Sequence, residues 1–131
     1  MPTGGCHCGA IRYSLAGEPK HSSVCHCESC RRTTGGLTTA WLGYPGEALT
    51  VEQGEPRSYS SSPGVERRFC GACGTSLFYA NEGAMPGVVD VLTATLDEPE
   101  AFAPALHVQT ADALPWEAGL EALPKFRRFP G

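Results

Sequence analysis

Seven cysteines are the residues of this 131-residue chain best suited to chemistry, and they fall into three short groups. The groups are Cys6-His7-Cys8, Cys25-His26-Cys27-Glu28-Ser29-Cys30 and Cys70-Gly71-Ala72-Cys73. Because seven is an odd number, disulfide bonds between these cysteines would leave one thiol without a partner. Closely spaced cysteines are instead typical zinc ligands, and around one zinc ion their sulfurs must converge to within about 4 Å of each other. The sequence therefore predicts metal binding ahead of disulfides.

The first and last groups together supply four ligands, which is the number that a closed structural zinc site needs. A tight turn at Cys70 and Cys73 would present both sulfurs, and Cys6 and Cys8 share one face of an extended chain. We expect these cysteines to bind one structural zinc that ties the start of the chain to a distant hairpin. The alternatives are ordinary buried thiols and a redox pair.

The middle group, Cys25, Cys27 and Cys30, then supplies three ligands. Three protein ligands and an open fourth position are typical of a catalytic zinc. Zinc bound by three thiolates carries a net charge of −1 and is a weak Lewis acid, so we expect it to accept a thiolate substrate rather than to generate hydroxide from water. The alternatives are a second structural site closed by a histidine, and reactive thiols without metal.

The histidines are weaker candidates. His7 and His26 each lie between two cysteines, so their side chains should point away from the face that the cysteines share. We therefore expect neither to bind metal, and we expect His21 and His107 to be ordinary polar residues.

Charged residues follow the middle cysteine group directly. Arg31 and Arg32 are either part of a solvated face or bind a carboxylate of the substrate. Glu28 and Ser29 are candidates for proton transfer in the same region. These assignments depend on the three cysteines forming a reactive centre.

The elements that must position these groups are predicted to be short. Sixteen glycines and eleven prolines indicate a chain rich in turns, and several segments alternate between apolar and polar residues in the manner of strands. We expect strands over 10–15, 37–44, 49–52, 57–60, 66–70, 76–80 and 88–95, and short helical turns over 28–34, 98–102 and 116–123. The predicted fold is mainly β, a single domain over residues 1–131 with small coiled antiparallel β-sheets pinned by the four-cysteine zinc.

Charge and hydropathy exclude several partners. The net charge is −4 and no run of lysine or arginine is longer than two, which disfavours nucleic-acid binding through a basic face. No apolar run approaches the roughly 18 residues that span a bilayer, and the N-terminal sequence lacks the basic and apolar regions of a signal peptide. We therefore expect a cytoplasmic protein that binds neither nucleic acid nor membrane; the oligomeric state is not predicted.

The cysteine motifs also resemble a known family, that of the glutathione-dependent formaldehyde-activating enzymes. The resemblance covers nearly the whole chain and lies in the segments Gly5-Cys6-His7-Cys8-Gly9 with Tyr13, Val24 to Arg32 with Gly35-Gly36, Phe69 to Leu77, His107, and Pro115-Trp116. It implies a fold shared with type B methionine sulfoxide reductases and centromere protein V. It also implies a structural zinc on Cys6, Cys8, Cys70 and Cys73 and a catalytic zinc on Cys25, Cys27 and Cys30, two zinc ions per chain.

The activity that this resemblance implies is that of an S-(hydroxymethyl)glutathione synthase-like carbon–sulfur lyase. Such an enzyme reversibly joins glutathione, or a related thiol, to formaldehyde or another small aldehyde. The alternatives are a zinc-stabilised binding module and a metal-responsive or thiol-sensing protein; a binding module does not need an incomplete zinc shell. Methionine sulfoxide reduction is disfavoured, because it requires two Cys-x-x-Cys pairs and a separate catalytic cysteine, which the spacing Cys6-His7-Cys8 does not provide.

Overall fold

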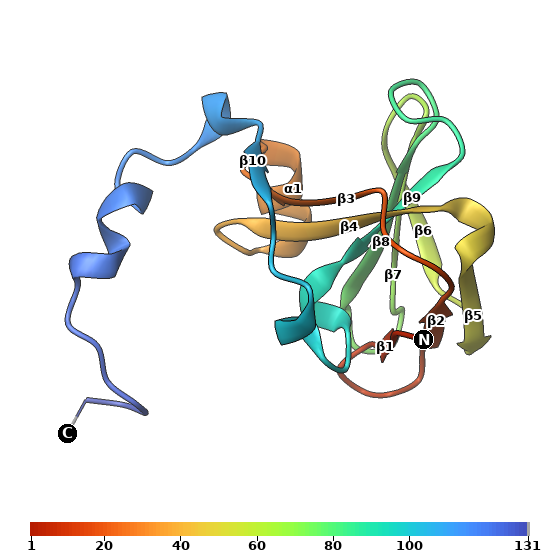
Figure 1. Cartoon of the computed structure of the whole chain (residues 1–131), viewed down its shortest axis with the longest axis horizontal. Helices are drawn as coiled ribbons and strands as arrows, with labels where there is room; N and C mark the ends of the chain where they lie inside the picture. The colour runs from red at the N-terminus through yellow and green to blue at the C-terminus, as the bar shows by residue number, and fades with distance from the viewer. Residues whose placement is uncertain (131) are drawn as a thin grey trace.

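The computed structural model describes residues 1–130, and most of their regular structure is β-strand (Figure 1). The strands are β1 (Thr3–Gly5), β2 (Arg12–Leu15), β3 (His21–Cys25), β4 (Thr39–Pro45), β5 (Leu49–Gln53), β6 (Arg57–Ser62), β7 (Val65–Phe69), β8 (Ser76–Asn81), β9 (Val88–Leu92) and β10 (Leu106–Val108). The α-helix is α1 (Glu28–Thr34), and the 3₁₀ turns are η1 (Gly46–Ala48), η2 (Thr93–Thr95), η3 (Pro99–Ala101), η4 (Thr110–Asp112) and η5 (Glu117–Ala122). The predicted mainly β fold is therefore confirmed.

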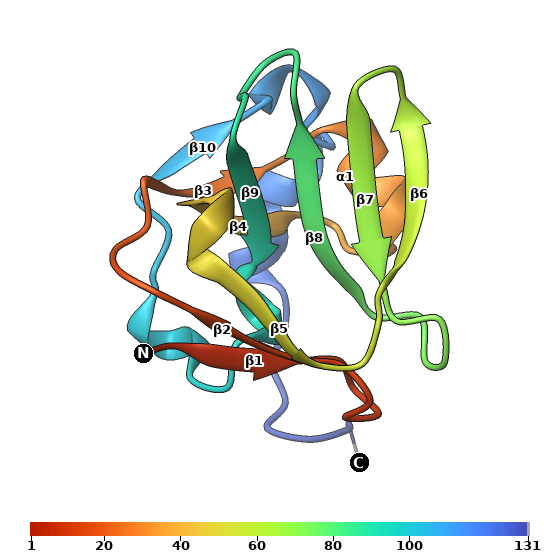
Figure 2. The same cartoon turned by 90° about the vertical axis from the view of Figure 1, so that its right-hand side faces the viewer.

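The strands form two sheets of unequal size. The smaller sheet has the order β1-β2-β5, and the larger has the order β10-β3-β4-β9-β8-β7-β6. Every pair is antiparallel except β10 with β3, which is parallel. Figure 2 shows β9, β8, β7 and β6 side by side, with β1, β2 and β5 crossing below them. Among the described strands, the β10–β3 pair is the departure from the expected antiparallel arrangement.

The main core contains large apolar side chains from both sheets. Tyr13 of β2 packs edge-to-face on Phe78 of β8, with ring centroids 5.1 Å apart, and both rings are buried. Leu15, Leu42 and Val91 are fully buried in the same cluster. Burial of apolar area of this kind is the main stabilising contribution to folding. The core thus joins the two sheets and fixes the strands that carry the cysteines.

Helix α1 is short because its sequence caps it at both ends. Cys27 is the N-cap residue, and its sulfur accepts a hydrogen bond from the backbone N–H of Cys30. Gly35 ends the helix at φ 75°, in the left-handed region where glycine is the least strained residue. The helix covers the range that the sequence predicted, and it places two cysteines of the middle group on a single turn.

Three strands were not predicted, namely β1, β3 and β10. Strand β3 reads His-Ser-Ser-Val-Cys, which lacks the alternation of apolar and polar residues that indicates a strand. It forms because β4 and β10 satisfy its backbone on both sides, a contact between segments distant in sequence. The predicted strand over 88–95 ends at Leu92, where the 3₁₀ turn η2 begins.

No helix within residues 1–130 combines the length and the apolar character that a membrane-spanning helix requires.

Candidate metal centres and the adjoining cavity

The first and last cysteine groups meet in space. The ligand atoms of Cys6, Cys8, Cys70 and Cys73 all lie within 4.8 Å of one another, and this four-thiol cluster could hold a metal ion. Cys6 and Cys8 approach from the turn after β1, and Cys70 and Cys73 from the turn between β7 and β8. The sulfurs of Cys6 and Cys8 are 3.6 Å apart and those of Cys8 and Cys70 are 3.8 Å apart.

These spacings fit tetrahedral zinc. Zn–S bonds of about 2.3 Å place two ligand sulfurs roughly 3.8 Å apart, whereas a disulfide requires about 2.05 Å. The hydroxyl and the backbone of Thr75 hydrogen-bond to Cys73 and lower the pKa of its thiol to about 5, which favours the thiolate that zinc requires. The donor set therefore suits a closed structural zinc.

The middle cysteines form a second cluster. Cys25 ends β3, Cys27 caps α1 and Cys30 lies within α1, and their ligand atoms also lie within 4.8 Å of one another. We call these residues the three-thiol cluster. The sulfurs of Cys25 and Cys30 are 3.9 Å apart, again the spacing of sulfurs around one zinc ion. Burial raises the pKa of the Cys25 thiol to about 12, so its thiolate needs a neighbouring positive charge.

Arg67 of β7 supplies a positive charge to the cluster beside Cys30, and no sequence motif marks it. Its guanidinium Nη1 lies 3.7 Å from the sulfur of Cys30 and donates a hydrogen bond to the hydroxyl of Thr33 at 3.2 Å. The residue is only 8% exposed, and its Cζ atom lies 4.7 Å from the centre of the Tyr79 ring. Across residues 1–130 no carboxylate forms an ion pair with it. Arg67 lies two positions after the buried Val65 and therefore on the same face of β7, and this spacing is the sequence signal that could have indicated its burial.

A cavity of about 400 Å³ adjoins the three-thiol cluster. All three cysteines of the cluster line it, together with side chains from β3, β4, β8, β9 and β10. Trp41 and Tyr79 form an apolar wall, with ring centroids 5.7 Å apart, and His21 and Asp90 are polar lining residues. The three-thiol cluster is thus open to a small molecule.

Histidines surround the cluster without joining it. His26 is buried between Cys25 and Cys27, and its ring nitrogens lie 2.9 Å from Nδ1 of His107 and 3.0 Å from a carboxylate oxygen of Glu117. Both ring nitrogens of His26 are therefore engaged away from the cluster, in the direction that the sequence predicted. The contact with Glu117, which connects the C-terminal segment to β3, was not expected from the sequence.

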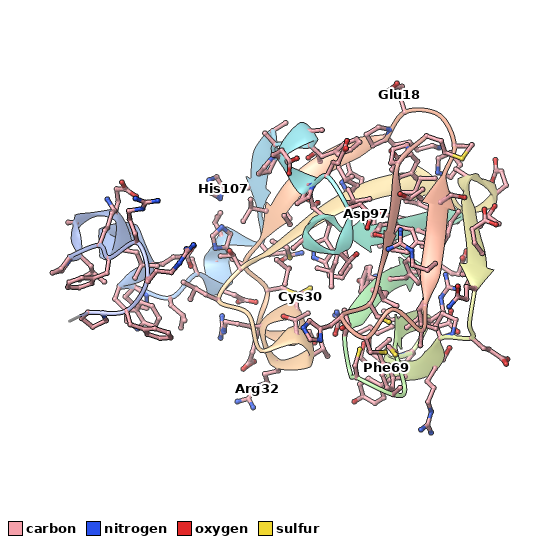
Figure 3. The ribbon with its side chains drawn as sticks, turned by 90° about the horizontal axis from the view of Figure 1, so that it is seen from below. Glu18, Cys30, Arg32, Phe69, Asp97 and His107 are labelled. Atoms are coloured by element: carbon pink, nitrogen blue, oxygen red, sulfur yellow. The ribbon has the colours of Figure 1, made fainter. Side chains whose placement is uncertain are left out.

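The two arginines after the cluster lie apart from the cavity. Arg31 donates a hydrogen bond of 2.9 Å to the backbone carbonyl of Asp112. Arg32 is exposed, pairs with Glu28 at 3.6 Å and points away from Cys30 (Figure 3). Neither arginine lines the 400 Å³ cavity. Arg32 instead lines a neighbouring groove of about 630 Å³, which it shares with Arg67 and Arg68.

The other proton-transfer candidates are also peripheral. The backbone N–H of Glu28 donates to a carboxylate oxygen of Asp112, and the carboxylate of Glu28 faces Arg32. Ser29 is exposed on α1, where its carbonyl accepts a hydrogen bond from Thr33. The structure therefore places neither Glu28 nor Ser29 in the lining of the cavity.

The fold is a small mainly β domain with two cysteine clusters that could hold metal ions, one beside the turn between β7 and β8 and one at the junction of β3 and α1. The chain belongs to the family of glutathione-dependent formaldehyde-activating enzymes, whose sequence model matches residues 1–112. The family predicted from the cysteine motifs is therefore confirmed.

Individual proteins agree with this assignment. An uncharacterised lyase of Schizosaccharomyces pombe is 36% identical over 84 residues, which are 59% of this chain and 56% of that protein. A putative glutathione-dependent formaldehyde-activating enzyme of Halomonas elongata is 36% identical over 85 residues, which are 57% of this chain and 53% of that protein. The chain thus spans about half the length of these curated relatives. The crystal structure of a Rhodobacter sphaeroides protein has the same fold, with a TM-score of 0.65 and 23% identity over 81% of this chain and 99% of that one.

Proposed function

We propose that this protein is a zinc-dependent carbon–sulfur lyase acting on adducts of glutathione, or a related thiol, with formaldehyde or another small aldehyde. In the forward direction the thiol sulfur bonds to the aldehyde carbon, and the thiol proton is transferred to the carbonyl oxygen. In the reverse direction the carbon–sulfur bond breaks and the proton returns to sulfur. Atoms and electrons balance without an oxidant or a reductant.

The observation that supports this proposal is the position of the three-thiol cluster. Its cysteines line a cavity of about 400 Å³, whereas a purely structural site needs no such access. Family membership supports the substrate class, since the family is that of the glutathione-dependent formaldehyde-activating enzymes.

The three-thiol cluster and the four-thiol cluster have separate roles in the proposal. Cys25, Cys27 and Cys30 would hold a catalytic zinc, and Cys6, Cys8, Cys70 and Cys73 a structural one. When bound, the catalytic zinc supplies a coordination position that lowers the pKa of a thiol and holds it as a thiolate.

Nearby side chains orient the reactants. Trp41 and Tyr79 restrict water on one side of the cavity, and Arg67 offsets the negative charge of the cluster. Arg31 and Arg32 stay proposed partners for substrate carboxylates. Arg31 would use donors other than the Nη1 group that binds Asp112, and Arg32 would bind a group extending beyond the cavity.

The test compares the wild type with Cys27→Ser. Serine keeps an oxygen that caps α1, so this variant removes a metal ligand while preserving the helix start. We expect it to contain one zinc ion per chain rather than two, to remain folded, and to lose the acceleration of formaldehyde exchange with glutathione, measured by ¹³C exchange NMR against the spontaneous rate. Arg127→Gln, on the exposed C-terminal segment outside both the cavity and the groove, is the control for a change in surface charge.

Two results would contradict the proposal. One is a wild-type protein that contains two zinc ions yet exchanges formaldehyde only at the spontaneous rate. The other is a single zinc whose sulfur coordination, followed by X-ray absorption, stays unchanged when glutathione is added. The second result would instead favour a zinc-stabilised binding module.

A further inference from the structure

A row of three residues crosses the large sheet at some distance from the cysteines. The register pairs His21 of β3 with Gly43 of β4, and Gly43 with Asp90 of β9. The side chains of His21 and Asp90 nevertheless meet, with Nε2 2.9 Å from Oδ1, although a complete strand separates their backbones. The ring of His21 therefore lies across the middle strand.

Gly43 makes this contact possible. A Cβ atom at residue 43 would lie 2.2 Å from both Cδ2 and Nε2 of the His21 ring, closer than real Cβ contacts allow. Any other residue would displace the ring from β4 and from Asp90. Because residue 43 has no side chain, the His21 ring has the space it needs to reach Asp90.

Asp90 is left with one oxygen available. Its side chain is 8% exposed, and only Oδ1 is bonded to His21. Within residues 1–130 no hydrogen bond is recorded for Oδ2. Burial raises the pKa of this carboxyl, and the neighbouring His21 ring opposes that rise. The fully buried side-chain oxygens without a partner in residues 1–130 are those of Tyr44 and Thr93, so Oδ2 of Asp90 is accessible, and a cationic or hydrogen-bond-donating ligand in the cavity could bind it.

The pair lines the same cavity as the three-thiol cluster. His21 and Cys25 lie four positions apart on β3 and on one face of the strand, a separation of about 13 Å between their Cα atoms. This distance corresponds to roughly four extended residues, so a ligand contacting both ends has the size of a short peptide. Among the described lining residues Asp90 supplies the carboxylate, and neither lysine nor arginine is present.

We propose that the His21–Asp90 pair is the subsite for the ammonium group of a peptide-sized thiol whose sulfur lies at the three-thiol cluster. This inference rests on the proposed function and names the group by which the thiol is recognised. The carboxylate of Asp90 accepts hydrogen bonds from the ammonium, and His21 fixes the orientation of that carboxylate. A thiol with a neutral group at this position leaves Asp90 Oδ2 without a partner.

The test measures binding of two thiols to the zinc-loaded full chain by titration calorimetry. The thiols are glutathione and N-acetylglutathione, in which a neutral amide replaces the ammonium. A hydrogen bond between charged groups contributes about 1.5–3 kcal/mol, so we expect the wild type to bind glutathione roughly 10- to 100-fold more tightly. In Asp90→Asn, which preserves shape, glutathione should bind as weakly as the acetylated thiol, whose own affinity should stay unchanged.

Two further variants complete the design. Asp97→Asn makes the same change at a carboxylate outside the cavity and should keep the preference for glutathione. Gly43→Ala should lose the preference by displacing the His21 ring, with circular dichroism and zinc content reporting whether it is folded. Equal binding of the two thiols by the wild type, or an undiminished preference in Asp90→Asn, would overturn the subsite. Binding of neither thiol by the wild type would contradict the proposed function itself.

Discussion

The guanidinium of Arg67 lies 3.7 Å from the sulfur of Cys30, in a position that is 8% exposed. Zinc bound by three thiolates has a net charge of −1, and a buried anion requires a counter-charge. Arg67 comes from β7, whereas the cysteines come from β3 and α1. With zinc bound as proposed, the cluster would be balanced by a charge from a strand that contributes no ligand.

Replacing this arginine should weaken metal binding. We expect Arg67→Met to reduce the zinc affinity of the three-thiol cluster roughly 10- to 100-fold, the usual effect of removing a residue that supports metal ligands. Competition with a chromophoric chelator measures the affinity. Arg68→Met is the matched control, because Arg68 follows Arg67 in β7, is more exposed and lies over Phe78 instead of the cluster. Equal affinities in the two variants would exclude the electrostatic role of Arg67.

The two clusters should differ in their importance for folding. Structural zinc contributes an apparent ~10–16 kcal/mol in small peptides, which is comparable with the ~5–15 kcal/mol stability of a domain. Cys73→Ser should therefore unfold the chain, whereas Cys27→Ser should remove one zinc and leave the fold intact. Zinc content and thermal unfolding followed by circular dichroism check both variants. A folded Cys73→Ser protein that retains two zinc ions would contradict the assignment of the four-thiol cluster.

The ion pair between Arg12 and Asp97 should make stability depend on acid pH. Asp97 also accepts a hydrogen bond from Thr3, and Arg12 and Thr3 together lower the pKa of its carboxyl to about 2. The lowered pKa means that this contribution is complete above pH ~4 and is lost as the pH falls toward 2.

Both side chains of this pair are partly exposed, so solvent screening limits the contribution to less than about 1 kcal/mol. Asp97→Asn should be less stable than the wild type at pH 7 by up to that amount, and the difference should disappear near pH 2. Urea unfolding at a series of pH values measures it. A difference that is constant with pH would show that the effect is not electrostatic.

Truncation should separate two parts of the C-terminal segment. Asp112 and Glu117 contact Glu28 and His26, whereas the hydrogen bonds recorded for residues 124–130 are local. A chain ending at Leu123 should match the full chain in zinc content and in unfolding midpoint. A chain ending at Gln109 should lose roughly 1–3 kcal/mol, because buried His26 and the first turn of α1 lose partners. Equal stability of the two truncated chains would contradict this division.

The sequence predicted the local features of the site and missed those that depend on distant strands. The spacing of the cysteines separated the residues of the two clusters, and the cap at Cys27 with Gly35 matches the expected short helix. No motif marks Arg67, because its burial depends on the packing of β7 over α1.

The cavity could not be predicted for the same reason. His21 was expected to be an ordinary polar residue, and Asp90 and Gly43 carry no motif. Their relationship arises from the register of three strands that are far apart in the chain.

The parallel pairing of β10 with β3 has a consequence for biosynthesis. Strand β3 ends in Cys25, and its outer edge stays without hydrogen-bond partners until Leu106–Val108 have left the ribosome. Leu106 and Val108 also line the cavity. During translation the nascent chain therefore exposes an open strand edge that ends at Cys25, and the addition of its last strand both protects that edge and completes the cavity wall.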